Sequence, residues 1–250
     1  MNKIKILFSL IFINLSFFIF SEPTAIELIN KVDDTRGPGL SFSCNVSMIS
    51  TEKKEVTESN VMKLLYKRQK DGANRALGYI FEPAEQKGRK VLLIGTDTWL
   101  YIPGSKKPIK ISPAQKLSGN TSTGDVLSVN YKSDYDPQII GEEKISGIDT
   151  YKLELVAKVP TVTYYKIVIY VSKNDFKPVK SEFFSKTEKL LKNAFYRKYQ
   201  KIGSKNVAVE ILIVDAIMKE NLTIVSYSNF KVEDIEESYF NKDILKDINI

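Results

Sequence analysis

The sequence has no histidine, one cysteine and one tryptophan. Without histidine it cannot form a Ser-His-Asp or Cys-His catalytic site, a histidine-ligated zinc centre, or the commonest general base of enzymes. The single Cys44 excludes a disulfide within the chain. We expect Cys44 to be a small buried hydrophobic side chain rather than a reactive thiol, because it lies on the apolar face of a predicted strand.

Adjacent acids are the main remaining candidates for acid-base catalysis. They are Asp33-Asp34, Glu142-Glu143 and Glu236-Glu237, and each pair lies in a polar stretch of sequence. Acidic side chains in such surroundings are usually solvated surface charges. The sequence therefore predicts no catalytic residue, no metal site and no cofactor.

Long hydrophobic runs are confined to the N-terminus. Residues 6–20 form an almost unbroken apolar run that two lysines precede and Ser21 follows. This pattern is typical of a secretory signal peptide cleaved near Ser21, and the run is shorter than the ~20 residues of a membrane-spanning helix. Because no cysteine follows the run, we expect no N-terminal lipid anchor. The prediction is a signal peptide over 1–21 and one exported domain over 22–250.

The formal net charge is +7, and the basic residues are mostly lysines spread evenly through the chain. They form no block of the kind that follows a phosphate backbone, so we predict no nucleic-acid partner. A mildly basic surface favours anionic membrane surfaces or acidic partners.

Short apolar stretches rich in β-branched and aromatic residues recur through the rest of the chain, separated by turns that contain Gly, Pro, Asn or Asp. We recognise about eleven such strands. Leu40–Met48 shows the pattern most clearly, because apolar and polar residues alternate along it. Short turns with no helices between the strands predict a mainly β fold, a curved antiparallel half-barrel with helices covering the concave face.

Three segments outside the strands carry helical signals. Thr24–Val32 is predicted as a helix, since Thr24 and Glu27 form a capping box and apolar residues follow at helical spacing. Ser112–Tyr135 is a polar excursion with weak helical pattern, and long excursions of this kind often cover a site. A closing helical turn is expected over Asn241–Leu245.

Large apolar side chains on the predicted inward positions suggest a hydrophobic cavity. At ~0.8 kcal/mol per buried CH₂, an acyl chain of about 16 carbons offers on the order of 10 kcal/mol gross. Such a ligand needs no catalytic group. The residues expected to line the cavity are Phe42, Met48, Leu64, Tyr66, Tyr79, Phe81, Leu93, Trp99 and Tyr101.

The Gly-x-x-x-Trp-x-Tyr-x-Pro run from Gly95 to Pro103 is the most specific of several motifs in the chain. The others include Phe81-x-Pro83, Lys87-Gly88, Val91-Leu92-Leu93, Asp134-Tyr135, Gly141-Glu142-Glu143 and Tyr151-x-Leu153-x-Leu155. Together these motifs resemble the LolA-like family of periplasmic outer-membrane lipoprotein-sorting proteins.

The resemblance implies a half-barrel with a lid of helices, located in the periplasm. It implies a monomeric carrier of lipoprotein or lipid cargo, with an inner-membrane transporter as donor and an outer-membrane acceptor. It also implies an arginine that pairs the lid with the sheet. Arg68 matches that position best and Arg75 is the alternative. Two alternative functions remain. The first is a sensor or interaction module on the same fold, and the second, which is less favoured, is a hydrolase.

Overall fold

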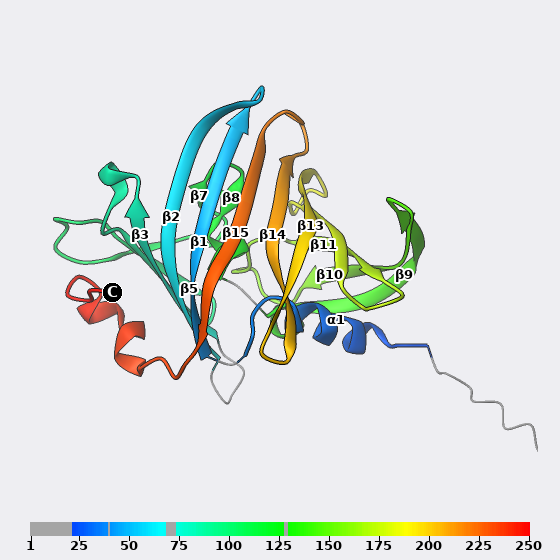
Figure 1. The fold of residues 1–250 in the computed structure, drawn as a ribbon, viewed down its shortest axis with the longest axis horizontal. Helices are drawn as coiled ribbons and strands as arrows, with labels where there is room; N and C mark the ends of the chain where they lie inside the picture. The colour runs from blue at the N-terminus through cyan, green and yellow to red at the C-terminus, as the bar shows by residue number, and fades with distance from the viewer. Residues whose placement is uncertain (1–21, 40, 69–73, 128–129) are drawn as a thin grey trace, which may run out of the picture.

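The computed structural model describes residues 22–39, 41–68, 74–127 and 130–250 (Figure 1). The predicted signal peptide lies outside the described residues, and so does Asp71-Gly72, a pair whose sequence predicts a hairpin turn. In the described part of the chain, thirteen strands form one antiparallel sheet and two more form a separate small hairpin.

The large sheet consists of two meanders. The strands of the first are β1 (Ser41–Glu52), β2 (Glu55–Arg68), β3 (Asn74–Glu82), β4 (Lys90–Ile94), β5 (Asp97–Tyr101) and β6 (Ile109–Ile111). Those of the second are β9 (Tyr135–Ile145), β10 (Ile148–Ala157), β11 (Lys166–Ser172), β12 (Pro178–Phe184), β13 (Leu190–Ile202), β14 (Lys205–Asp215) and β15 (Leu222–Val232).

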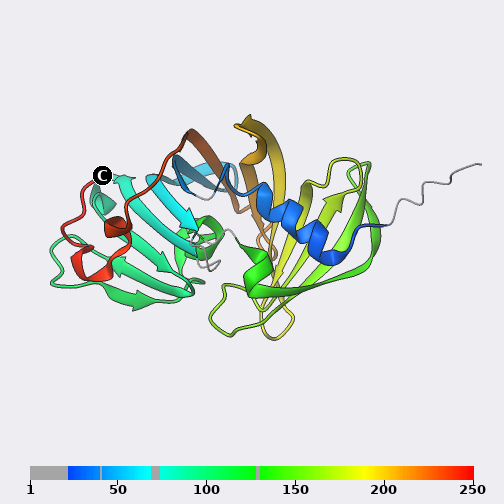
Figure 2. The same ribbon diagram turned by 90° about the horizontal axis from the view of Figure 1, so that it is seen from below.

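The two meanders join at a single seam, where β1 pairs with β15. The strand order runs from β6 through β1 to β15 and on to β9, so β6 and β9 are the two edges. The sheet is strongly curved but not closed into a barrel (Figure 2). The mainly β, antiparallel prediction is confirmed.

The predicted number of about eleven strands is too low. Fifteen strands occur among the described residues, and the ones not predicted are β6, β7 (Lys116–Ser118) and β8 (Thr121–Ser122). Each has only two or three residues and lies in a polar stretch of sequence. Two or three residues are too few to establish an alternation, and pairing with neighbouring strands decides their conformation.

Helix α1 (Ala25–Asp34) confirms the predicted N-terminal helix. The Glu27 amide donates to Thr24 Oγ1 (3.2 Å), and the Thr24 amide donates to Glu27 Oε2 (2.8 Å), which completes the capping box. Its apolar stripe buries Leu28, Ile29 and Val32. No helix in the described ranges is long and apolar enough to cross a membrane.

The segment between β6 and β9 contains the β7–β8 hairpin and two short helices, α2 (Thr123–Leu127) and α3 (Tyr131–Asp134). We call α1, α2 and α3 together the cover. Figure 2 shows α1 beside the strands of the second meander, where it contacts β9, β14 and α3. The cover contributes Val126, Leu127 and Tyr131 to the same buried cluster as the apolar stripe of α1.

The sheet carries a hydrophobic core on each face. The inner face is the one on which the alternating apolar residues of β1 pack against the cover, and Cys44 is fully buried there. Burial raises the pKa of the Cys44 thiol to about 12, so it stays protonated and unreactive, as predicted.

The outer face of β2–β5 is covered by the C-terminal segment. There Leu65, Leu77 and Leu92 pack against Ile235, Phe240, Leu245 and Ile248. The predicted closing turn over Asn241–Leu245 appears as the 3-10 helix η3 (Lys242–Ile244). Two further 3-10 helices were not predicted: η2 (Glu237–Phe240), which precedes η3, and η1 (Ala84–Gln86), which follows β3. Lys90 Nζ donates to the carbonyls of Leu245 (2.9 Å) and Lys246 (3.0 Å), which fixes this segment to β4.

Candidate functional site

The predicted cavity residues divide between the two faces of the sheet. Five of them lie in the inner cluster beneath the cover: Phe42, Met48, Leu64, Tyr66 and Leu93. Phe42 and Tyr66 stack with ring centroids 5.0 Å apart, and Phe42 also contacts Phe230 (6.0 Å). The structure therefore brings these five side chains together on one apolar wall.

The other four do not belong to that wall, and their predicted placement is wrong. Trp99 and Tyr101 pack in the outer cluster against the C-terminal segment. Tyr79 lies near Lys90 on the same outer side, and Phe81 contacts Tyr79 with ring centroids 5.0 Å apart. The strands that carry them are buried on both faces, so alternation alone could not tell the inner side from the outer one.

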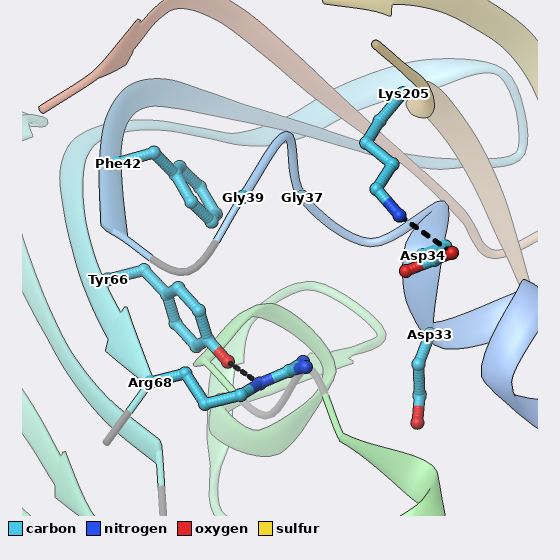
Figure 3. A pocket seen from close by; sticks show the side chains of 8 residues that line it. All are labelled: Asp33, Asp34, Gly37, Gly39, Phe42, Tyr66, Arg68 and Lys205. Carbon is cyan, nitrogen blue, oxygen red and sulfur yellow. Dashed lines mark hydrogen bonds and ion pairs between the residues drawn. The ribbon is translucent and has the colours of Figure 1, made fainter. Parts of the chain in front are cut away.

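A cavity of about 250 Å³ opens at the C-terminal end of α1 (Figure 3). Its side chains combine two aromatic rings from the inner wall with two acidic and two basic groups. The lining residues are Asp33, Asp34, Gly37, Gly39, Phe42, Tyr66, Arg68 and Lys205. We call this cavity the mouth, because it connects the exterior with the inner wall at Phe42 and Tyr66.

The polar groups of the mouth are held by a few contacts. Arg68 Nε donates to the Tyr66 hydroxyl (3.3 Å), and that hydroxyl donates to Asn74 Oδ1 (2.6 Å). Lys205 forms an ion pair with Asp34 (2.7 Å), which ties the β13–β14 turn to the end of α1. The mouth is thus a charged rim over an aromatic wall.

The two arginines that the sequence could not separate lie on different faces. Arg68 is in the mouth, close enough to α1 to affect the pKa of Asp33. Arg75 forms an ion pair with Glu237 of the C-terminal segment on the outer side. Only Arg68 therefore has the position from which a side chain could contact the cover.

Asp33 joins two parts of the cover. Its carboxylate accepts the amides of Tyr131 (2.8 Å) and Lys132 (3.0 Å), at the start of α3. The residue is 8% exposed. Burial raises the pKa of Asp33 to about 6, although the two amides and the charges of Arg36 and Arg68 oppose the rise.

Arg36 lies just past α1 and points into the interior. Its guanidinium lies 4.4 Å from the centroid of the Tyr131 ring, and Nη2 donates to the Asp125 carbonyl (3.4 Å). It borders a small space of about 20 Å³ between the cover and β12–β15, together with Tyr196 and Tyr227. Because small-molecule sites usually occupy about 300–1,000 Å³, the interior is closed in this conformation.

A buried ion pair fastens α2 to the sheet. Lys192 on β13 donates to Asp125 Oδ2, and the two side chains are 8% and 9% exposed. Asp125 also accepts the Tyr164 hydroxyl (2.7 Å) and both the amide (2.7 Å) and hydroxyl (2.9 Å) of Ser122. Lys192 donates in addition to the Asn120 carbonyl (2.9 Å). We call this cluster the clamp.

The sequence did not identify Arg36, Asp125 or Lys192 as functional candidates. The one local signal was the position of Arg36, directly after a predicted helix and before Gly37. Asp125 and Lys192 lie 67 residues apart in sequence, so no local pattern connects them. Among the described residues no group of three or more acidic or cysteine side chains could hold a metal ion.

Comparisons with known proteins extend over most of the chain. A family model with the description "Uncharacterized protein" matches residues 72–247. A LolA superfamily protein from Nitrosomonas europaea is 31% identical, with 89% of this chain and 99% of that chain covered and a TM-score of 0.82. No curated protein matches in sequence.

Two further solved structures share the fold. A putative outer membrane lipoprotein-sorting protein domain from Vibrio parahaemolyticus is 23% identical over 89% of this chain and 98% of that one, with a TM-score of 0.76. A DUF1329 family protein from Desulfovibrio piger is 22% identical over 88% and 97%, with a TM-score of 0.77.

Proposed function

We infer the function from one premise: the chain belongs to the LolA superfamily. We propose that it is a periplasmic carrier that binds the acyl chains of a lipoprotein or another lipid between the inner face of its sheet and the cover. In this proposal residues 22–250 form one lipid-binding domain, exported with a signal peptide over 1–21. The protein has no enzymatic activity and works as a monomer.

One observation carries this proposal: the apolar inner wall lies under the cover, and the two meet through buried apolar side chains. The cover contributes Leu28, Ile29, Val32 and Leu127 to the inner cluster. Its polar attachments include the Lys205–Asp34 pair at the mouth and the clamp at α2. When a lipid displaces the cover, apolar contacts between the cover and the inner wall are replaced by apolar contacts between the lipid and the inner wall. Because the two sets of contacts are of the same kind, the apolar part of the free-energy difference between the closed protein and the lipid-loaded protein is small.

The mouth suits the polar end of such a ligand. Arg68 supplies a positive charge beside the Tyr66 hydroxyl above the aromatic wall, while Lys205 is paired with Asp34. A lipid whose chains lie along Phe42 and Leu64 would place its ester carbonyls near these groups. The cargo then passes from an inner-membrane transporter to an outer-membrane acceptor.

The experiment compares two arginines that lie on neighbouring strands and opposite faces. Uptake of a fluorescent fatty-acyl probe, and transfer of that probe between vesicles, are measured for the wild type, Arg68→Leu and Arg75→Leu. We expect Arg68→Leu to change uptake and impair transfer while the circular dichroism spectrum stays the same. Arg75→Leu, the control, should transfer like the wild type.

Lipid extracted from the purified protein and identified by mass spectrometry provides the independent check. Lipid-free protein that also takes up no probe would contradict the carrier proposal. Equal transfer by both arginine variants would contradict the role of the mouth but not the carrier function.

A second function has one observation in its favour, the interior space of only about 20 Å³. On this alternative the protein is a periplasmic sensor or interaction module that stays closed. It predicts tight binding to a membrane-protein partner with no transfer of lipid between vesicles.

A further inference from the structure

A second cavity, of about 240 Å³, lies on the outer side of the molecule, away from the mouth. It is formed between the β5–β6 loop and the C-terminal turn η3, which lie side by side in Figures 1 and 2. Its lining residues are Trp99, Lys106, Lys107, Pro108, Lys242, Asp243 and Lys246. We call it the lysine pocket.

The charge of the lysine pocket is only partly compensated. Lys242 pairs with Asp243, and Lys246 lies 4.0 Å from Asp247. Lys106 and Lys107 are exposed, and neither has a carboxylate within ion-pair distance among the described residues. Two adjacent positive charges are therefore available to an anionic partner.

Trp99 forms the floor of the lysine pocket. Its ring packs in the outer cluster yet stays partly exposed, and two ammonium groups lie near it, Lys110 Nζ at 5.9 Å and Lys242 Nζ at 5.7 Å from the centroid. Tryptophan with flanking lysines is typical of surfaces at the membrane–water interface, where an amphipathic ring meets phospholipid head groups.

We propose that the lysine pocket docks the protein on a bilayer surface that contains anionic phospholipids. Lysine ammonium groups are compact charges on flexible stems, so they can reach the scattered phosphate oxygens of a head-group layer. A phospholipid head group meets the exposed lysines while Trp99 faces the interfacial layer. This docking surface is separate from the inner wall, so it stands whether or not the interior carries lipid.

Vesicle binding tests the proposal, with Trp99 as its own reporter because it is the only tryptophan. The purified protein is titrated with phosphatidylcholine vesicles that contain or lack phosphatidylglycerol. We expect binding and a blue shift of the emission with the anionic vesicles only, and loss of both in high salt. The Lys106→Ala/Lys107→Ala variant should bind about 25-fold more weakly, since each lysine near an anionic surface contributes about fivefold.

The matched control is Lys53→Ala/Lys54→Ala, which removes two exposed lysines from the β1–β2 turn. It should bind like the wild type. Equal losses in the two double variants would mean that net charge alone governs binding and would overturn the proposal. Absence of binding to anionic vesicles would overturn it too, even if the same lysines retained an acidic polypeptide such as polyglutamate.

Discussion

The buried carboxylate of Asp33 should make the stability of this protein depend on pH in an unusual direction. Burial raises its pKa from the ordinary value of 3.8 to about 6. In the unfolded chain the group titrates near pH 4, so between about pH 4 and pH 6 the folded state holds a proton that the unfolded state has released. The stabilisation that protonated Asp33 contributes to the folded state is therefore fully present below pH 4 and is lost as the pH rises through 6.

The size of the effect follows from the shift. Each pKa unit corresponds to about 1.4 kcal/mol, so a shift of about two units corresponds to about 3 kcal/mol. The side chain of Asp33→Asn cannot ionise, so the free energy of unfolding of this variant lacks the pH dependence that Asp33 causes. It also offers one acceptor instead of two to the amides of Tyr131 and Lys132, which adds a cost that does not vary with pH.

The assay is urea unfolding of the wild type and Asp33→Asn at a series of pH values. The free energy of unfolding of the wild type minus that of the variant should fall by about 3 kcal/mol between pH 4 and pH 6.5 and then stay level. Asp34→Asn, next along α1 with a half-exposed carboxylate, is the control and should keep the wild-type slope. A flat difference curve would refute the reasoning, since it would mean that Asp33 ionises equally easily in both states.

Two further predictions concern the attachment of α2. Asp125→Asn leaves Lys192 buried without a charged partner and should lower the free energy of unfolding in urea by about 3–5 kcal/mol. Adding Lys192→Met should recover most of that loss. If the losses of the two single variants simply add, the pair is not coupled. A Cβ at Gly124 would lie 1.8 Å from Thr163 Oγ1, so Gly124→Ala should cost about 1–3 kcal/mol, and Thr163→Ala in the same chain should restore stability. Wild-type melting of Gly124→Ala alone would contradict the packing argument.

Local chemistry made much of the fold predictable. The capping residues of α1 act within one turn, and Thr24 with Glu27 forms the expected pair. The alternation that predicts a strand over Leu40–Met48 corresponds to β1, which has the bounds Ser41–Glu52. In both cases the determining contacts are between near neighbours in sequence or arise from one regular alternation.

Side-chain placement on the sheet was less predictable. Trp99 belongs to a strand with apolar residues on both sides, and only the docking of Ile235 and Phe240, far along the chain, makes its side the outer one. The clamp is equally non-local, because Asp125 meets Lys192 only after β13 has joined the sheet. The position of Arg68 in the mouth likewise depends on where α1 ends, which its own strand does not determine.

The seam between β1 and β15 has a consequence for how the chain reaches its native state. Each pair of strands elsewhere in the large sheet, among the described residues, joins neighbours in sequence, whereas Phe42 on β1 pairs with Val232, about 190 residues later. Loop-closure entropy is therefore concentrated in one step, and we expect this step to come late in folding. Until β15 pairs with it, β1 presents an open edge of unpaired amides and carbonyls, and we expect an incompletely folded chain to be most exposed to aggregation there.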